Sequence, residues 1–425
     1  MSRGVAGTPP RLALQGPPVA GAASERPRPP EAAIQWRPRG GTTAPPPEPD
    51  IESHEEAAGG PLWSCALGGI PDANGRTWKV VEELWAQVAA RPSYAGPVVS
   101  EGLRAARTLG SKERPLAGDL LAALLKNPRA LARVDADPIV ALKRVIREGV
   151  PALLDPDDAY AVALSLPDDL ASEWWTTLGP LQARRHVKVL AGRAPVTLRV
   201  LRGSADEVEL PVPARVLGPR TLVLDARTNL HVAPAWQEGR VEVQDLGSQR
   251  IVDAAFARVG AGARVLDLCA GAGGKALALA ALGARVQAWD VRPAALRELE
   301  KRAGRCGLDV YIAPARAGDR FDLVLVDAPC SGTGVLRRHP ENRWKLAFPT
   351  EVQAQLLARA LELAPQVVYG TCSLADRENG ALVRRVGGEP VAEETVWPGR
   401  PIPAVHGLPA IEGDPEGFYW AHLTK

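Results

Sequence analysis

From Ala263 onward, short apolar runs alternate with helical patterns, and this alternation limits the fold more than any other feature of the sequence. The first apolar run, residues 264–268, leads through a glycine-rich turn into an alanine-rich helical pattern at residues 276–282. A second apolar run follows at residues 285–289. Strands that alternate with helices in this way build a parallel sheet covered on both faces. We therefore predict an α/β domain with a doubly wound, mostly parallel sheet over residues 246–425.

Two later strands of this region end in polar motifs that contain cysteines. Residues 323–326 form an apolar run that stops at Asp327-Ala-Pro-Cys330, and residues 366–369 run into a Gly-Thr-Cys motif ending at Cys372. Open α/β sheets place their active sites at the carboxyl ends of strands. A free cysteine is often only a small buried hydrophobe, but packing alone does not require a proline before the first thiol and glycines after it. We expect Asp327, Cys330 and Cys372 to be catalytic.

The turn after the first strand has the composition of a cofactor-binding loop. Glycines let a ligand approach the backbone, and the next helix's N-terminus favours negative charge. Asp290 ends the second strand about twenty residues on, where a carboxylate can accept hydrogen bonds from ribose hydroxyls. Glycine spacing and Asp290 do not separate NAD from S-adenosylmethionine, although the Ala-Gly-Ala-Gly-Gly turn departs from the strict dinucleotide pattern. The predicted cofactor contacts are Cys269, Ala270, Gly271, Ala272, Gly273, Gly274, Lys275, Asp290, Arg292 and Asp327.

The overall composition excludes several classes of protein. A formal charge of +2 on 425 residues is nearly neutral, so nucleic-acid binding would depend on local basic patches. The five cysteines are odd in number and lack metal-ligand spacing, which predicts reduced thiols, no metal and no secreted disulfide framework. The sequence contains no apolar run near the roughly eighteen residues that span a membrane. We expect a cytoplasmic monomer without membrane contact.

The N-terminal part of the chain divides by composition. Residues 1–72 are rich in Pro, Gly and Ala and are predicted to be disordered, because they cannot bury enough apolar surface. Residues 73–160 carry apolar side chains at helical spacing, among them Trp78, Val81 and Trp85, and predict a helical domain. A basic cluster in this domain is either an RNA-contacting face or an ordinary solvated one. Its members are Arg104, Arg107, Lys112 and Arg114.

Residues 161–245 predict a small α+β domain. The segments 196–200 and 221–224 have the β-branched content of strands. A basic stretch without an intervening acid precedes and overlaps the first of them, and it predicts either a phosphate-contacting surface or a solvated face. Its members are Arg184, Arg185, His186, Lys188, Arg193, Arg199 and Arg202.

Taken together, several motifs resemble those of the RNA cytosine-5 methyltransferases, the NOL1/NOP2/Sun family. The motifs are the segment 265–275, Asp327-Ala-Pro-Cys330-Ser-Gly-Thr-Gly334, Arg338-His-Pro-Glu341, Thr371-Cys372-Ser373 with Glu378-Asn379, the VQD-x-x-SQ segment at 243–249, and residues 290–305. They cover roughly residues 196–385 and are jointly specific. The helices of residues 73–160 resemble, more loosely, the NusB-like domain of the Sun (RsmB) branch, which modifies small-subunit ribosomal RNA in bacteria.

This resemblance implies a Rossmann-like, S-adenosylmethionine-dependent methyltransferase domain, preceded by a small α+β RNA-binding domain and an all-helical NusB-like RNA-binding domain. The implied reaction is methylation of carbon 5 of a cytosine in RNA, with 16S ribosomal RNA as the expected substrate. By the resemblance, Cys372 is the nucleophile that adds to carbon 6, Cys330 assists release, and Asp327 contacts the N3 edge of the base. Lys275 and Asp290 would lie in the cofactor and active-site pocket, with Asp290 on the ribose.

The resemblance also assigns a role to a basic segment, and the chain departs from the family's motifs at two places. The segment is expected to hold RNA phosphate or to help lower a thiol pKa, and it consists of Arg337, Arg338 and His339. An acidic residue that contacts adenine in the family is missing from residues 311–317, and only Asp319 lies nearby. The loop before the catalytic strand, residues 363–366, is shorter than the usual Lys-Pro-Gly-Gly turn.

Three other functions compete with this hypothesis. A transfer-RNA cytosine-5 methyltransferase would use the same catalytic residues. A non-catalytic RNA-binding assembly factor would fit the altered third strand, but it would have no use for two strand-end cysteines with Asp327. An NAD-linked enzyme is disfavoured by the spacing of the glycine turn. Affinity for S-adenosylmethionine separates the enzyme from the assembly factor.

Overall fold

The computed structural model describes residues 71–149, 159–226, 228–344 and 346–425. All of these described residues belong to one compact unit. The disordered tail predicted for residues 1–72 therefore lies, apart from its end, outside the described residues. Among the helices described, none is both long and apolar enough to cross a membrane.

A seven-stranded sheet with the order β10-β11-β9-β8-β5-β6-β7 forms the centre of the C-terminal half. Its strands are β5 (Arg264–Asp267), β6 (Arg285–Ala288), β7 (Val310–Ile312), β8 (Leu323–Asp327), β9 (Gln366–Thr371), β10 (Ala392–Val396) and β11 (Phe418–Thr424). The five strands from β5 to β9 pair in parallel, whereas β11 is antiparallel to both β9 and β10. The predicted α/β domain with a mostly parallel sheet is confirmed, and its antiparallel end is an addition to that prediction.

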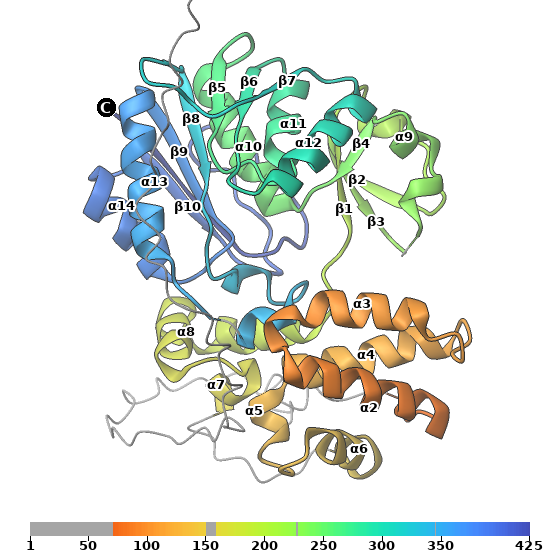
Figure 1. The fold of residues 1–425 in the computed structure, drawn as a ribbon. Helices are drawn as coiled ribbons and strands as arrows, with labels where there is room; N and C mark the ends of the chain where they lie inside the picture. The colour runs from red at the N-terminus through yellow and green to blue at the C-terminus, as the bar shows by residue number, and fades with distance from the viewer. Residues whose placement is uncertain (1–70, 150–158, 227, 345) are drawn as a thin grey trace, which may run out of the picture. The chain divides into compact units, whose positions relative to one another are not determined.

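Helices cover both faces of this sheet (Figure 1). Leu323 and Leu325 of β8 pack in a core with helices α10, α11 and α12, whereas Val324 and Val326 pack with α13 and α14. Successive side chains of a strand point to opposite faces, so an unbroken apolar run is what a strand buried on both sides requires. The helices are α10 (Leu246–Val259), α11 (Gly274–Ala281), α12 (Pro293–Cys306), α13 (Thr350–Leu363) and α14 (Gly380–Gly387).

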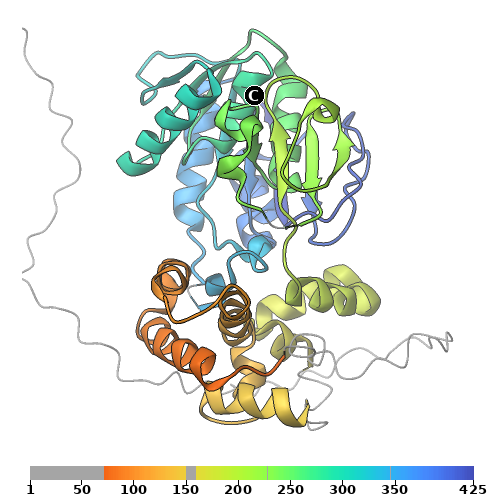
Figure 2. The same ribbon diagram turned by 90° about the vertical axis from the view of Figure 1, so that its right-hand side faces the viewer.

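A small antiparallel sheet precedes this domain and has the order β2-β3-β1-β4. Its elements are β1 (Thr197–Val200), β2 (Ala214–Gly218), β3 (Thr221–Leu224), the short helix α9 (Pro234–Gln237) and β4 (Val241–Val243). Leu198, Leu222 and Val241 are buried in a core of its own. Figure 2 shows its strands in light green as a sheet separate from the large one.

The chain up to Ala191 is helical in its described parts. Its helices are α2 (Gly75–Ala90), α3 (Ala95–Ala105), α4 (Glu113–Lys126), α5 (Pro128–Leu131), α6 (Pro138–Glu148), α7 (Ala159–Leu164) and α8 (Asp168–Ala191). Asn74 and Asp137 cap α2 and α6 by accepting hydrogen bonds from the backbone N–H groups of their first turns. Helix α8 bends at Gly179, which has a φ of +71° and is followed by Pro180. A helical region and a small antiparallel sheet thus precede the seven-stranded sheet.

The basic stretch of residues 184–202 does not form one surface, so that prediction is wrong. Arg199 is 4% exposed, because it lies on a buried strand and pairs with Asp253 at 2.8 Å. His186 is also buried, with its Nδ1 3.2 Å from the hydroxyl of Tyr160. Arg193 forms an ion pair with Asp119. The basic residues of this stretch are thus divided between helix α8, the loop after it, strand β1 and the segment that follows β1, and two of them are buried.

Candidate active site

The carboxyl ends of β5, β8 and β9 meet at one edge of the sheet, because the three strands are parallel neighbours. In this register Asp327 pairs with Gly370. The loops that leave β8 and β9 then bring two thiols together, so that Cys330 Sγ lies 3.3 Å from Cys372 Sγ. The structure therefore places the three residues predicted to be catalytic beside one another.

The two thiols differ in their surroundings. The hydrogen bond to Cys372, together with burial, raises the pKa of the Cys330 thiol well above its usual value. Cys330 therefore stays protonated at neutral pH, and its S–H is able to donate a hydrogen bond to the sulfur of Cys372. The thiolate is the nucleophilic form of a cysteine, so the protonated Cys330 is poorly suited to act as the nucleophile.

Lys275 adds a positive charge to this group. Its Nζ lies 2.7 Å from Oδ2 of Asp327. Burial alone would lower the pKa of Lys275, but the Asp327 carboxylate outweighs burial and the pKa is raised. The ammonium group also interacts electrostatically with Cys372. Lys275, which was predicted as a cofactor contact, is thus paired with the carboxylate predicted to be catalytic.

Asp267, at the end of β5, is a site residue that the sequence analysis missed. Both of its carboxyl oxygens are buried and have no hydrogen-bond partner among the described residues. Burial, reinforced by the charge of Asp327, raises the pKa of Asp267 to about 7. Leaving such a group unpaired is costly, so a cationic ligand would be bound favourably there. The sequence signal was present, since Asp267 ends its strand as Asp327 ends β8.

Gly273 of the glycine-rich turn has no room for a side chain. Gly273 has a φ of +87°, and a Cβ added to it would lie 2.0 Å from the side chain of Leu299. From α12, Arg302 donates a 2.7 Å hydrogen bond to the carbonyl oxygen of Ala272. Arg302 is in turn paired at 2.8 Å with Glu242, which is buried at the end of the small sheet. The backbone of the turn is therefore held in place, with α11 beginning at Gly274.

Asp290 follows β6 and already accepts four hydrogen bonds. One comes from the backbone N–H of Gly271 at 2.9 Å, and three come from the backbone N–H and the guanidinium of Arg292 at 2.8 to 2.9 Å. The bond from the Arg292 side chain is the main reason that the pKa of Asp290 is lowered to about 2. A carboxylate accepts about four hydrogen bonds, so a ribose would have to displace the exposed guanidinium of Arg292.

A buried network fixes the two loops that carry the thiols. Ser331 donates to Glu378 through its backbone N–H at 2.9 Å and through its hydroxyl at 2.5 Å. Gly334 donates its N–H to the carbonyl oxygen of Cys372 at 2.9 Å. A Cβ on Gly334 would lie 2.1 Å from the carbonyl oxygen of Gly417. The Ser-Gly-Thr-Gly motif and Glu378 therefore position the thiols.

The role expected for Arg337 is wrong. Arg337 is buried and donates to both carboxyl oxygens of Asp414 at 2.8 and 2.9 Å. Arg338 is paired at 3.2 Å with Asp245. The guanidinium of Arg337 is therefore occupied inside the protein and is no phosphate ligand, whereas Arg338 is paired but keeps 30% of its side chain exposed. His339 is half exposed and lies 3.2 Å from a Glu341 oxygen.

Within the described part of the chain, the segment after strand β7 offers no free acidic side chain that could contact an adenine. Strand β7 ends at Ile312, and Asp319 accepts a 2.7 Å hydrogen bond from the backbone N–H of Arg316. Asp319 therefore stabilises its own loop. The Ala313 carbonyl is likewise occupied, since Gln287 donates to it at 3.1 Å.

Comparison with known proteins finds a family model and curated relatives that resemble this chain. Residues 258–389 match the family model described as "16S rRNA methyltransferase RsmB/F". The ribosomal RNA small subunit methyltransferase B of Citrobacter koseri is 34% identical over 227 residues, which are 49% of this chain and 52% of the relative. The protein of the same name from Vibrio cholerae is 31% identical over 278 residues, covering 58% of this chain and 62% of the relative. The chain thus spans about half the length of the first curated relatives it matches.

Solved structures share the fold. The crystal structure of PH0851 has a TM-score of 0.59 at 18% identity and covers 83% of this chain and 99% of its own. A methyltransferase homologue from Pyrococcus horikoshii has a TM-score of 0.50 at 22% identity and covers 64% of this chain and 100% of its own. The region matched by the family model carries the glycine turn, Asp327 and both thiols, so this part of the chain is similar to the RsmB/F family of 16S rRNA methyltransferases.

Proposed function

We propose that this protein transfers a methyl group from S-adenosylmethionine to carbon 5 of a cytosine in RNA, with 16S ribosomal RNA as its substrate. The observation that carries the proposal is the thiol pair, 3.3 Å apart, beside the Lys275–Asp327 ion pair. The names of the relatives support a small-subunit ribosomal RNA substrate. A protein that only bound RNA would gain nothing from this arrangement of thiols and charges.

The residues around the glycine turn suit S-adenosylmethionine. When bound, this cofactor supplies a methyl group on a positively charged sulfonium. Asp267 offers an unpaired buried carboxylate to a cation, and the glycine turn lets a ligand approach the backbone closely. Asp290 is placed to receive ribose hydroxyls once Arg292 moves aside. The proposed cofactor residues are therefore Asp267, Asp290, Asp327 and the turn Cys269-Ala270-Gly271-Ala272-Gly273-Gly274-Lys275, and Arg292 is the residue that must leave Asp290 when the ribose binds.

The proposed chemistry begins at Cys372. Carbon 5 of cytosine is a poor nucleophile until a thiolate adds to carbon 6, which forms a C–S bond and moves electron density to carbon 5. Asp327 would hydrogen-bond the N3 edge of the base, and Lys275 holds that carboxylate in place. After methyl transfer, a base such as water takes the proton from carbon 5, the electrons of that C–H bond form the C5–C6 double bond, and the sulfur of Cys372 leaves carbon 6 with the electrons of the C–S bond. We assign to Cys330 the assistance of this release step, and the target base would have to be unstacked to reach the thiol.

The remaining parts of the chain are proposed to bind RNA in the cytoplasm. Helices α2 to α6 would form the NusB-like domain, and the small sheet β1 to β4 would form the second RNA-binding domain. Both assignments rest on the resemblance of the sequence and on the presence of a helical region and an antiparallel sheet before the catalytic domain. The protein is proposed to act as a monomer.

Bisulfite sequencing of total RNA from cells with and without this gene tests the proposal. Loss of one protected cytosine from small-subunit ribosomal RNA is the expected result. Loss of a methylated site in transfer RNA instead would support the same mechanism with transfer RNA as the substrate. An unchanged methylation pattern, combined with no detectable binding of S-adenosylmethionine by the purified protein, would establish the non-catalytic assembly factor instead.

A further inference from the structure

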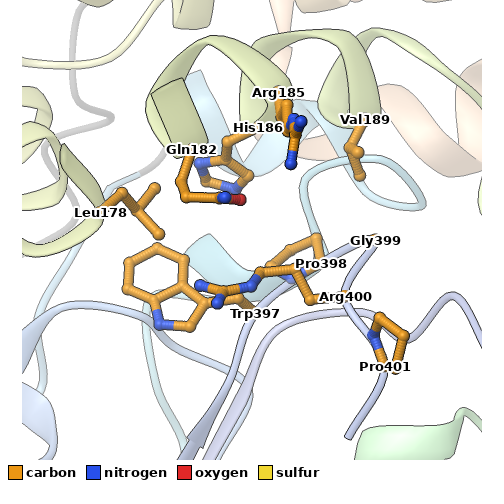
Figure 3. A pocket seen from close by; sticks show the side chains of 10 residues that line it. All are labelled: Leu178, Gln182, Arg185, His186, Val189, Trp397, Pro398, Gly399, Arg400 and Pro401. Carbon is orange, nitrogen blue, oxygen red and sulfur yellow. The ribbon is translucent and has the colours of Figure 1, made fainter. Parts of the chain in front are cut away.

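A cavity of about 350 Å³ lies outside the proposed active site, between helix α8 and the segment 397–401 (Figure 3). Leu178, Gln182, Arg185, His186 and Val189 line it from α8. From Gln182 onward these positions recur at three and four residues, so one face of the second half of α8 is turned to the cavity. Figure 3 shows these side chains facing Trp397 and Arg400 on the opposite wall.

The lining combines cations with aromatic rings. Arg185 and Arg400 both line the cavity, and none of the described residues that line it is acidic. Arg400 is exposed and takes part in no ion pair within the described part of the chain. The ring of Trp397 lies 5.5 Å from that of His186. Such a lining suits a ligand that has both a planar ring and a negative charge.

His186 provides a buried polar atom without a partner. Its side chain lines the cavity but is only 4% exposed, and its Nε2 has no hydrogen-bond partner among the described residues. Its other nitrogen lies 3.2 Å from the hydroxyl of Tyr160. Burial, with the nearby charge of Arg337, lowers the pKa of His186 to about 3, so the ring is neutral. A neutral imidazole and the Gln182 amide can read the hydrogen-bonding edge of a base.

The back of the cavity is connected to the catalytic loop through Trp174. The Trp174 ring packs 5.3 Å from the His186 ring and 6.1 Å from the Trp397 ring. Its indole N–H donates a 3.2 Å hydrogen bond to the carbonyl oxygen of Leu374, which belongs to the loop that carries Cys372. A ligand in the cavity would therefore contact the packing that positions the nucleophile.

We propose that this cavity binds one unpaired nucleotide of the RNA substrate, with its base against Trp397 and its phosphate on Arg185 and Arg400. Proteins that bind single-stranded RNA combine aromatic platforms for bases with arginines for the backbone in this way. The volume lies at the lower end of the range of small-molecule pockets, which suits one nucleotide. The inference rests on the proposed function only in that the substrate is RNA.

Two variants of the full-length protein test the site. Arg400→Glu reverses an exposed charge at the cavity, and Gln182→Glu places a carboxylate on the opposite wall with almost no change in size. Arg320→Glu is the matched control, because Arg320 is an exposed arginine near the amino end of β8, at the sheet edge away from the proposed active site. All three variants are compared by circular dichroism and by their affinity for S-adenosylmethionine, which should stay unchanged.

RNA binding is measured by filter binding with a 16S ribosomal RNA transcript, and methylation kinetics are measured with the same transcript. Both cavity variants should weaken RNA binding roughly tenfold and raise KM without changing kcat, whereas Arg320→Glu should stay within about twofold of the wild type. In the unsubstituted protein, irradiation of a 4-thiouridine-substituted transcript should crosslink a peptide that contains Trp397 or Gln182.

The outcomes separate this inference from the proposed function. If the protein bound the transcript in an Arg400-dependent way but did not methylate it, the proposed reaction would be wrong and the nucleotide site would still be supported. Equal RNA affinity of Arg400→Glu and Arg320→Glu would overturn the site, whatever the activity. If Arg400→Glu weakened binding of AMP and inorganic phosphate but not of the transcript, the cavity would be a site for free nucleotides and the inference would be wrong.

Discussion

The sulfur atoms of Cys330 and Cys372 lie 3.3 Å apart, although the two residues are separated by 42 positions in the sequence. Two parallel neighbouring strands, β8 and β9, produce this approach, and the buried bonds from Ser331 to Glu378 maintain it. A pair of thiols at this distance can share a proton, divide the work of attack and release, or be oxidised to a disulfide. The first two predictions separate these uses.

Replacing Cys330 by Ala should trap a covalent complex between the protein and its RNA. Addition by Cys372 would still occur, but release would be slow without the neighbouring thiol. A band of reduced mobility on a denaturing gel, which disappears after ribonuclease treatment, is the expected result. The double variant Cys330→Ala/Cys372→Ala should give no such band, and Cys372→Ala alone should lose methyl transfer by roughly 10³-fold or more. Normal turnover of Cys330→Ala without an adduct would show that the release role is wrong.

Mild oxidation should inactivate the protein reversibly. Hydrogen peroxide would be reduced to water while the two thiols lose two protons and two electrons and form a disulfide. Burial raises the pKa of Cys269 to about 12 and that of Cys306 to about 11, so these thiols should react slowly. Peptide mapping should find a bond between Cys330 and Cys372, and dithiothreitol should restore activity. Lasting inactivation with both thiols still free would contradict this prediction.

Binding of S-adenosylmethionine should strengthen as the pH rises towards neutrality. Burial raises the pKa of Asp267 to about 7, and only its ionised form attracts a cation. Below about pH 7 the ligand must therefore displace a proton from Asp267. The affinity should fall by up to about tenfold for each unit by which the pH is lowered below about 7, and it should be constant above about pH 7. Isothermal titration between about pH 5.5 and pH 7 measures both the affinity and the released proton. Asp267→Asn should bind more weakly and almost independently of pH. An unchanged slope in this variant would mean that another group titrates.

Local sequence patterns predicted the parts of the site that depend on neighbouring residues. The apolar run of residues 323–326, the glycine turn and the strand-end cysteines each follow from backbone requirements within a few positions, and the parallel sheet then brings them together. Contacts that form over long separations were not predictable. Arg337 was taken for a phosphate ligand because its partner Asp414 lies 77 positions away. The unpaired state of Asp267 depends likewise on what covers it, which no local pattern records.

Replacing Arg292 by Gln should tighten binding of S-adenosylmethionine by roughly two- to fivefold. In the structure the exposed guanidinium occupies both carboxyl oxygens of Asp290 at 2.8 and 2.9 Å, and these are the atoms assigned to the ribose hydroxyls. The guanidinium side of this ion pair is exposed, and such pairs contribute on the order of 1 kcal/mol, so the gain from removing the competitor is modest. Arg297→Gln, on the same helix but without a role at Asp290, serves as the control and should leave the affinity unchanged. Burial raises the pKa of Asp267 to about 7. Isothermal titration of all three proteins is therefore carried out at about pH 7.5, where most of the Asp267 carboxyl is ionised. Weaker binding by Arg292→Gln would contradict this prediction. It would mean that the guanidinium of Arg292 contacts the cofactor together with Asp290.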